Sequence, residues 1–225
     1  MVAAVLTSAD HEVAKALAGS GGVVCATSDE LLELGADAIL SAGNQYMFPP
    51  NVIQAMPFGI INFHAAPLPE YRGSSCAAFA ILNGATTFGA SFHLVDATLD
   101  TGPILHVETF PIAEGDCAAD LDRRAVEAGL AVLEKLGAAL FNGSLEPWPQ
   151  SDSSNSKPFR RGDLAPHRLV SLDTAPDDIW RHVRACDWDG VTAPAFIDLG
   201  AGRRVYLTSA PRGDWIGRKN EAQDG

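Results

Sequence analysis

The stretch GIINFHAAPLPEYRG, residues 59–73, decides how the rest of the chain is interpreted. It begins with a mostly apolar run that predicts a buried strand, residues 59–63, running directly into His64. A loop rich in proline follows. Alternate residues of a strand point to the same side, so Asn62 and His64 share one face at the carboxyl end of this strand. Open α/β sheets bind their ligands at that end.

Short apolar runs alternate with helix-like segments on both sides of this strand. Such alternation is typical of βαβ units. The sequence therefore predicts an α/β fold with a mostly parallel sheet. We expect further strands at 2–6, 23–26, 37–41, 89–95 and 103–110, and helices at 10–18, 29–34, 51–55, 76–82 and 116–141.

A polar, proline-rich stretch, PWPQSDSSNS at residues 147–156, is the one clear change in composition along the chain. It predicts a linker, residues 147–158, between a larger N-terminal domain, residues 1–146, and a small appendage, residues 159–225. The appendage is expected to be α+β, with a helix at 175–185 and strands at 195–198 and 204–209.

The composition is that of a globular protein, with 47% hydrophobic residues among 225. Its 16 Lys+Arg and 28 Asp+Glu give a net charge of −12, which disfavours a nucleic-acid binder because phosphate backbones attract basic surfaces. No apolar run reaches the roughly 20 residues of a membrane span. The N-terminus lacks the basic start of a secretory signal. We therefore expect a cytoplasmic protein that contacts neither nucleic acid nor membrane.

The cysteines and glycines argue against two further kinds of site. None of the four cysteines forms a CxxC pair, so we expect reduced thiols and no metal site. The turn after the first expected strand, residues 7–10, carries neither GxGxxG nor GxxxxGK[ST]. An NAD enzyme and a P-loop NTPase are therefore poor interpretations.

A second polar turn, DTGP at residues 100–103, can bring Asp100 against His64 while Asn62 stays free. An Asn N–H can stabilise an oxyanion, a His can move a proton near pH 7, and an Asp can orient the His. This combination suits direct acyl transfer to an amine, in which the substrate amine is itself the nucleophile. An Asn and a His at a strand end also often satisfy loop backbone groups, and that alternative stays open on spacing alone.

Three segments together resemble the signature of the folate-dependent formyltransferases: NFHAAPLPEYRG at 62–73, a strand containing His93, and DATLDTGPI at 96–104. That family includes glycinamide ribonucleotide, methionyl-tRNA and sugar N-formyltransferases. The resemblance covers residues 37–141 and implies a Rossmann-like sheet, with residues 1–146 as the catalytic domain. It also implies N10-formyltetrahydrofolate as the formyl donor, and catalytic roles for Asn62, His64 and Asp100.

The resemblance assigns further positions to the two ligands. The pterin ring of the donor would lie between two stretches of chain, Tyr46, Met47, Phe48 and Ile53 on one side and Asp96, Ala97, Thr98 and Leu99 on the other. The apolar Phe48 and Ile53 fit ordinary core packing equally well. The residues facing the acceptor would be Tyr71, Arg72, Gly73 and His93. His93 is either a pocket-lining residue or a satisfied core histidine.

Departures from the family pattern narrow the choice of acceptor substrate. Ala66-Pro67-Leu68-Pro69 stands where the family usually has Ser-Leu-Leu-Pro, so a hydroxyl near the site is absent. The stretch before Asn62 is short for the family, so we expect a shortened N-terminal half of the sheet. The first turn lacks the phosphate-binding glycines of the purine enzymes. The residues after Ser151 are too few for the tRNA-binding barrel of the methionyl-tRNA enzymes.

We therefore expect an N-formyltransferase that acts on a primary amine of a small molecule, with a nucleotide-linked amino sugar as the first choice. The appendage resembles the tail of the sugar enzymes. Its Arg160 and Arg161 can reach a phosphate, and they fit a solvated basic face equally well. One alternative acceptor is a hydroxyornithine-type or carrier-bound amine. An alternative of another class is a non-catalytic folate-binding remnant. A homodimer through the appendage strands is also compatible with the sequence.

Overall fold

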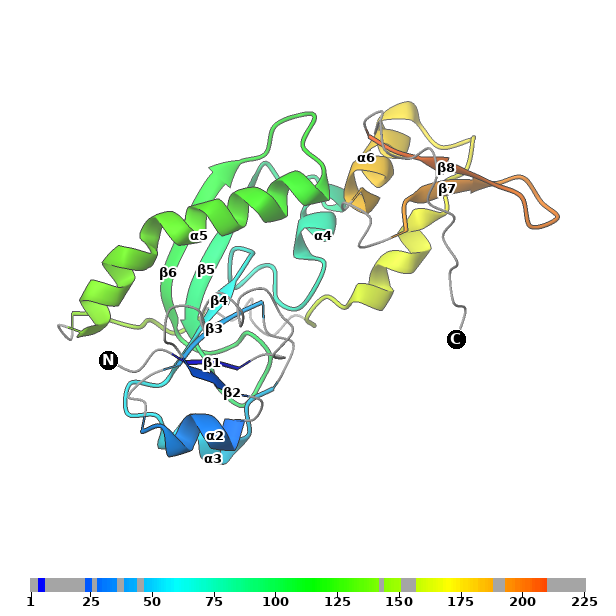
Figure 1. The fold of residues 1–225 in the computed structure, drawn as a ribbon. Coiled ribbons are helices and arrows are strands. Elements are labelled where there is room, and N and C mark those ends of the chain that lie inside the picture. The colour runs from blue at the N-terminus through cyan, green and yellow to red at the C-terminus, as the bar shows by residue number, and fades with distance from the viewer. Residues whose placement is uncertain are drawn as a thin grey trace.

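The central sheet has four strands in the order β3-β4-β5-β6 (Figure 1). The computed structural model describes residues 4–6, 23–25, 28–35, 39–43, 47–141, 144–150, 157–187 and 193–209. The four strands are β3 (Ile39–Ala42), β4 (Ile60–His64), β5 (Thr87–Leu94) and β6 (Ile104–Pro111). A second, two-stranded sheet pairs β1 (Ala4–Leu6) with β2 (Val23–Cys25).

The central sheet is mixed. The pairs β1–β2 and β3–β4 are parallel, whereas β4–β5 and β5–β6 are antiparallel. The α/β class and the Rossmann-like sheet are confirmed, but the parallel pairing expected for most of the sheet ends at β4. The loop at 95–103 between β5 and β6 explains part of this difference, because a parallel pair needs a crossover of a dozen or more residues.

Helices cover both faces of the sheet. The helix α5 (Ala118–Phe141) packs Val132, Leu133 and Leu136 against Ile61, Phe92 and Leu105. On the other face, α3 (Pro50–Ala55) packs Val52 against Ile39 and Ile60, and Leu32 of α2 (Ser28–Glu33) joins the same cluster. Ile60 and Ile61 are consecutive in β4, so they point to opposite faces and serve the two layers separately.

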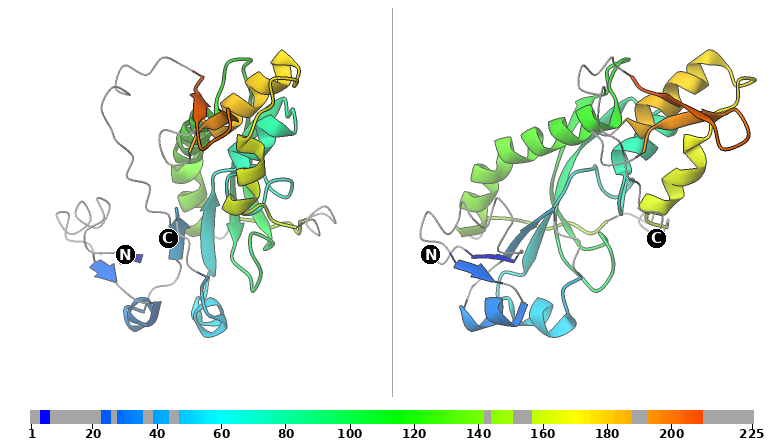
Figure 2. Two further views of the ribbon diagram at one scale, coloured as in Figure 1. Left: turned by 90° about the vertical axis from the view of Figure 1, so that its right-hand side faces the viewer. Right: turned by 45° about the vertical axis from the view of Figure 1, so that its right-hand side comes forward.

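The C-terminal segment packs on α4 (Cys76–Leu82) (Figure 2). It consists of a 3₁₀ helix (Arg161–Arg168), α6 (Pro176–Cys186), β7 (Ala195–Asp198) and β8 (Arg204–Leu207), the last two forming an antiparallel hairpin. Phe79 of α4 and Val183 of α6 belong to one buried cluster. The appendage therefore shares its core with the sheet, and the boundaries at residues 146 and 158 remain our proposal.

Expected elements that fall within the described residues lie within two residues of their predicted ranges. The helix predicted at 10–18 lies outside the described residues. The 3₁₀ helix is not predicted, because Gly162 and Pro166 read as helix breakers. Among the helices that the structure describes, none is long and apolar enough to cross a membrane.

The helix α5 approaches the sheet closely at Gly129. A Cβ atom built there would lie 2.1 Å from Cε2 of Phe63 in β4. Phe63 itself packs against Phe92, with ring centroids 5.3 Å apart, which limits how far its ring can move. Gly137, two turns further along the same helix, has no heavy atom within 4 Å of the corresponding position.

We predict that Gly129→Ala lowers the free energy of unfolding by about 1–2 kcal/mol, because the added methyl group must displace Phe63. Gly137→Ala is the matched control and should raise it by about 0.5–1 kcal/mol, since Ala favours the helix and meets no clash there. Urea denaturation of both variants measures the difference. Equal stabilities would show that α5 can move away from the sheet at Gly129.

Candidate active site

The strand β4 presents Asn62 and His64 on one face, and its pairing with β5 places two partners beside them. In the antiparallel register Asn62 lies opposite His93, and His64 lies opposite Ser91. Directly opposite residues of an antiparallel pair project on the same side and are close enough to interact. The buried Ser91 hydroxyl donates to the carbonyl of Ala66 (2.8 Å) and accepts from the N–H of Leu68 (2.9 Å). This fixes the proline-rich loop after β4 against the sheet.

Asn62 is oriented by a buried histidine. Its Nδ2 lies 3.1 Å from Nε2 of His93, and Nδ1 of His93 lies 2.9 Å from the carbonyl oxygen of Leu94. A neutral imidazole that donates from Nδ1 accepts at Nε2. One Asn62 N–H is therefore bound to His93, and the second remains available to the cavity that Asn62 lines.

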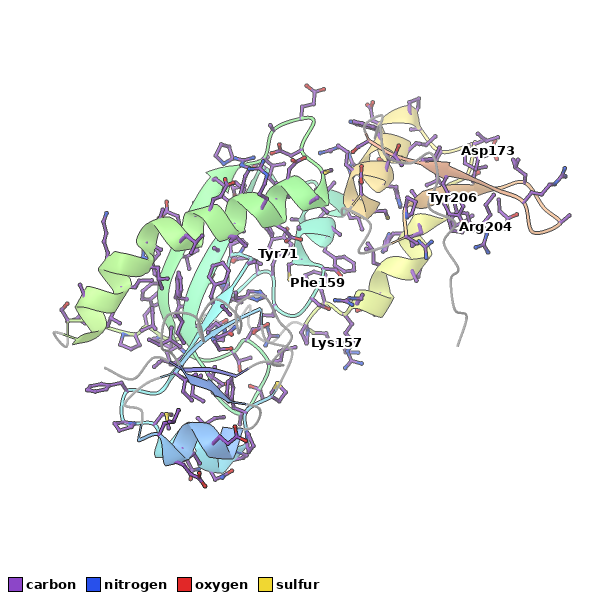
Figure 3. All side chains as sticks on the ribbon, viewed as in Figure 1. Tyr71, Lys157, Phe159, Asp173, Arg204 and Tyr206 are labelled. Atoms are coloured by element: carbon purple, nitrogen blue, oxygen red, sulfur yellow. The ribbon has the colours of Figure 1, made fainter. Side chains whose placement is uncertain are left out.

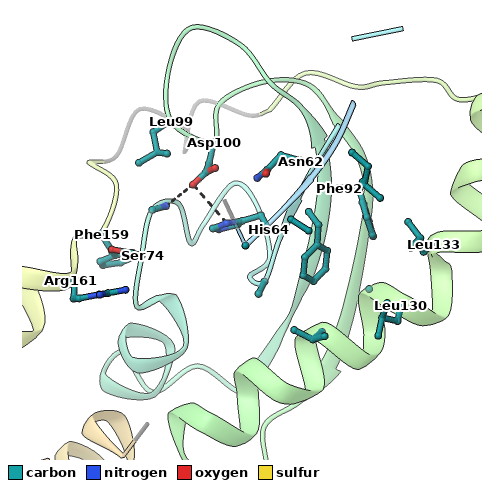
Figure 4. A pocket seen from close by; sticks show the side chains of 18 of the residues that line it. Asn62, His64, Ser74, Phe92, Leu99, Asp100, Leu130, Leu133, Phe159 and Arg161 are labelled. Carbon is teal, nitrogen blue, oxygen red and sulfur yellow. Dashed lines mark hydrogen bonds and ion pairs between the residues drawn. The ribbon is translucent and has the colours of Figure 1, made fainter. Parts of the chain in front are cut away.

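His64 is held by a backbone carbonyl and faces a carboxylate. Its Nε2 lies 2.6 Å from the carbonyl oxygen of Tyr71, so this nitrogen carries a proton and donates it. Its Nδ1 lies 3.8 Å from Oδ2 of Asp100 (Figure 4). Nδ1 is therefore the ring nitrogen left to take up a proton beside a negative charge.

Asp100 is buried, and its backbone has a positive φ of 54°. Its Oδ2 accepts the N–H of Gly73 at 2.8 Å, and its Oδ1 lies 3.5 Å from Nε2 of His93. Gly73 has φ of 96°, and a Cβ there would lie 2.1 Å from the carbonyl oxygen of Phe159. A glycine is therefore required at this position of the Tyr-Arg-Gly motif, where the N–H reaches Asp100.

The surroundings set the charges of the two groups. Burial lowers the pKa of His64, and the opposing effects of the Asp100 carboxylate and the Tyr71 carbonyl do not fully offset it. Burial raises the pKa of Asp100, but His93, the charge of His64 and the Gly73 N–H together outweigh burial and hold that pKa below its usual value. At neutral pH the site therefore holds a neutral imidazole beside a carboxylate.

A cavity of about 890 Å³ lies beside Asn62, His64 and Asp100. Leu130 and Leu133 of α5 line one side of it, and Phe159 and Arg161 line the opposite side (Figure 4). A notch of about 50 Å³ adjoins it, because Asn62, Leu99 and Asp100 line both. The other residues of the notch are Ser41, Met47, Phe48, His93, Val95 and Thr98.

The residues expected to contact the donor fall into two groups. Met47, Phe48, Thr98 and Leu99 line the notch. Ile53 packs with the core under α3, and neither Asp96 nor Ala97 lines the notch. The Asp96 carboxylate accepts the N–H of Thr98 (3.0 Å) and the hydroxyl of Thr101 (2.8 Å), so it shapes the turn. Tyr46 lies outside the described residues.

Of the residues expected to face the acceptor, Gly73 lines the large cavity, whereas Tyr71 and Arg72 do not. Tyr71 holds His64 through its carbonyl, and its ring stacks on Phe159 with centroids 5.9 Å apart (Figure 3). Arg72 is buried. His93 is also buried and lines only the notch.

One wall of the cavity was not predicted from the sequence, and the position of its two arginines was predicted only in part. The α5 wall, Val126, Leu130 and Leu133, was not predicted, although its apolar spacing is visible in the sequence. Arg160 and Arg161 reach the cavity because Phe159 pairs with the loop after β4. Its N–H donates to the Arg72 carbonyl, and its carbonyl accepts the Ser74 N–H, both at 2.9 Å.

Comparison with known proteins shows the family to which the chain belongs. The family model described as formyl transferase matches residues 14–135, more than half of the chain. The chain belongs to the formyltransferase family. The methionyl-tRNA formyltransferases of Solibacter usitatus and Pelobacter propionicus are 38% identical over 120 residues and 33% identical over 164 residues. These matches cover 53% and 72% of this chain and 39% and 50% of the two relatives, so the chain spans half of their length or less.

Solved structures share the fold of this chain. A sugar N-formyltransferase from a Shewanella species superposes with a TM-score of 0.73 and 21% identity, over 89% of this chain and 81% of the other. A 4-N formyltransferase from Francisella tularensis superposes with a TM-score of 0.77 and 17% identity, over 91% and 84% of the two chains. The α/β architecture is therefore that of the family.

We predict that Asp100→Asn lowers the pKa of His64 further. The Asp100 carboxylate stabilises the imidazolium, so its removal lets the proton leave at a lower pH. Titration of the His64 ring by ¹⁵N NMR in the free protein measures the shift. Asp173→Asn, an exposed change in the appendage, is the control and should leave the pKa unchanged. A raised pKa in Asp100→Asn would contradict the electrostatic account.

Proposed function

We propose that this protein transfers the formyl group of N10-formyltetrahydrofolate to a primary amine of a small molecule, with a nucleotide-linked amino sugar as the acceptor. The observation that carries the proposal is the convergence of Asn62, His64 and Asp100 beside one large cavity in a formyltransferase chain. No nucleophile of the protein is needed, because the amine attacks directly.

The notch beside Asn62 suits the pterin end of the donor. Phe48, Val95 and Leu99 provide apolar walls, and the loop at 95–99 offers backbone donors and acceptors. Two solved structures of similar fold are complexes with folates. They are a Helicobacter canadensis N-formyltransferase with folinic acid and an Aquifex aeolicus protein with tetrahydrofolic acid. When bound, the donor supplies the formyl carbon.

Asn62 is the proposed oxyanion donor. Negative charge develops on the formyl oxygen as the amine adds, and the free Nδ2–H of Asn62 is placed to donate to it. His93 accepts the other N–H of the Asn62 amide, so the amide is oriented before the reaction begins. We therefore place His93 in a positioning role, behind Asn62 and away from the acceptor.

His64 and Asp100 are the proposed proton acceptor pair. The attacking nitrogen becomes positively charged and must lose a proton, which the neutral Nδ1 of His64 can accept. The Asp100 carboxylate, 3.8 Å away, stabilises the imidazolium that forms. His64 can then return this proton to the leaving nitrogen, as the bond between that nitrogen and the formyl carbon breaks and tetrahydrofolate is released. Cys76, whose Sγ lies 3.9 Å from Nε2 of His64, is not a nucleophile here, because burial strongly raises the pKa of its thiol.

An anionic acceptor is supported by the two arginines at the cavity mouth. Neither Arg160 nor Arg161 is in an ion pair with another described residue, and both line the cavity. Guanidinium groups that line a substrate cavity favour a phosphate-bearing ligand. The Helicobacter canadensis structure, at 23% identity and a TM-score of 0.68, is a complex with dTDP-3-aminofucose. A nucleotide-linked amino sugar fits both observations.

We predict that the purified protein formylates a nucleotide-linked amino sugar and that Asn62→Ala lowers kcat by about 10²–10³-fold, the usual cost of removing an oxyanion donor. Mass spectrometry of the product and release of tetrahydrofolate follow the reaction. Asn51→Ala, an exposed change in α3, is the matched control. Wild-type turnover in Asn62→Ala would refute the assigned role.

The acceptor panel separates the alternatives. Methionyl-tRNA tests the activity named for the sequence relatives. A hydroxyornithine-type amine tests a secondary-metabolite acceptor, and an aminoacyl carrier protein tests the need for a partner. Tight folate binding without transfer to any of these amines would replace the catalytic proposal with a folate-binding remnant.

We predict that Arg161→Ala raises KM for a diphosphate-linked amine by about tenfold, as expected for one lost charge-assisted hydrogen bond of about 1.4 kcal/mol, with little change in kcat. KM for an uncharged amine of similar size should not change. Arg203→Ala, which removes an exposed arginine of the β7–β8 turn, is the control. An equal rise in KM for charged and uncharged amines would show that Arg161 does not bind the diphosphate.

A further inference from the structure

The side-chain amide of Gln150 bridges two backbone carbonyls of the turn that carries Asp100. Its Nε2 donates to the carbonyl oxygen of Asp100 at 2.9 Å and to that of Gly102 at 2.8 Å. The two hydrogens of one NH₂ group therefore satisfy both acceptors. The contact joins residues about fifty positions apart in the chain.

The turn at 100–102 needs such support. Asp100 has φ of 54°, and the left-handed region costs a residue with a Cβ roughly 1–2 kcal/mol. Gly102 is pressed against the end of β5, because a Cβ there would lie 1.9 Å from the carbonyl oxygen of Leu94. On its side-chain end, Asp100 is held by the Gly73 N–H. Gln150 holds the backbone end of the same residue.

Gln150 is itself anchored to the sheet. Two residues earlier, Trp148 pairs with Ile104, the first residue of β6, through hydrogen bonds of 2.9 Å and 2.8 Å in an antiparallel bridge. The composition of this segment predicts a linker, yet Trp148 forms an isolated bridge to the start of β6. Gln150 thus lies two residues from a point where the backbone is paired with the sheet.

We propose that Gln150 is a positioning residue for formyl transfer, whose amide N–H groups hold the 100–102 turn so that the Asp100 carboxylate stays against His64. The inference rests on the proposed function and adds to it a residue outside the cavity. Glutamine suits the role because it offers two N–H donors at the end of its chain. Methionine has similar length and no donor, and glutamate places a carboxylate against two carbonyl oxygens.

The kinetic test compares Gln150→Met and Gln150→Glu with the wild type. We expect kcat for formyl transfer to fall by about 10–100-fold in both variants, because a small displacement of Asp100 misplaces the proton acceptor pair. KM for the amine should stay within about threefold, because Gln150 does not line the cavity. Gln54→Glu in α3, which is exposed, makes the same chemical change elsewhere and should retain full activity.

A second measurement needs no substrate and separates this inference from the proposed function. The Asp100 carboxylate raises the pKa of His64, so loss of the amide contact should lower that pKa in Gln150→Met, as followed by ¹⁵N NMR. If the wild type transfers no formyl group, the proposed function fails while the titration still decides the inference. An unchanged His64 pKa, or a loss of kcat explained by a lower melting temperature, overturns the positioning role.

Discussion

The site depends on keeping one carboxylate charged inside the protein. Asp100 is buried, and a buried charge is tolerated only when donors and opposite charges surround it. Here the N–H of Gly73, from the loop after β4, donates to Oδ2. The imidazoles of His64 and His93, from β4 and β5, lie 3.8 and 3.5 Å from the carboxylate oxygens, and a proton taken up by His64 supplies the opposite charge. Three segments of the chain must therefore meet at one point. The geometry that satisfies Asp100 is also the geometry that places His64 for proton transfer.

The antiparallel half of the sheet makes this meeting point reproducible. The β4–β5 register sets Asn62 opposite His93 and His64 opposite Ser91. A slip of one residue would turn these side chains to the other face, against α5. The hydroxyl of Ser91 ties the loop after β4 to the same strand. One strand pair thus orients the amide, the imidazole and the loop that donates to the carboxylate.

The sequence reveals the chemical groups better than it reveals what holds them. Asn62, His64 and Asp100 were predictable, because polar residues at the end of an apolar strand stand out and match a family pattern. Tyr71 was expected to face the acceptor, yet it serves His64 through its carbonyl, a group that every residue carries. Gln150 binds two carbonyls across the fold and sits in a segment whose composition signals a linker. Every residue has a backbone carbonyl, so the sequence does not show which residue a side chain will bind through that group.

The same limit applies to the antiparallel pairing. Alternating apolar runs and helices fit a parallel sheet, and only the short 95–103 loop distinguishes β5–β6 from a crossover. The roles of the site residues remain proposals, and they rest on the contacts described above rather than on the residue pattern alone.

Charge distribution bears on the acceptor more directly than similarity does. The sequence relatives are named methionyl-tRNA formyltransferases, whereas the solved structures of the same fold include a sugar N-formyltransferase. A tRNA presents many phosphates, and tight binding requires a broad basic surface whose affinity falls steeply with salt. This chain has a net charge of −12, and its cavity mouth offers one local pair of arginines. A pair of guanidinium groups matches a diphosphate far better than a polyanion, and for that reason we favour the nucleotide-linked amine.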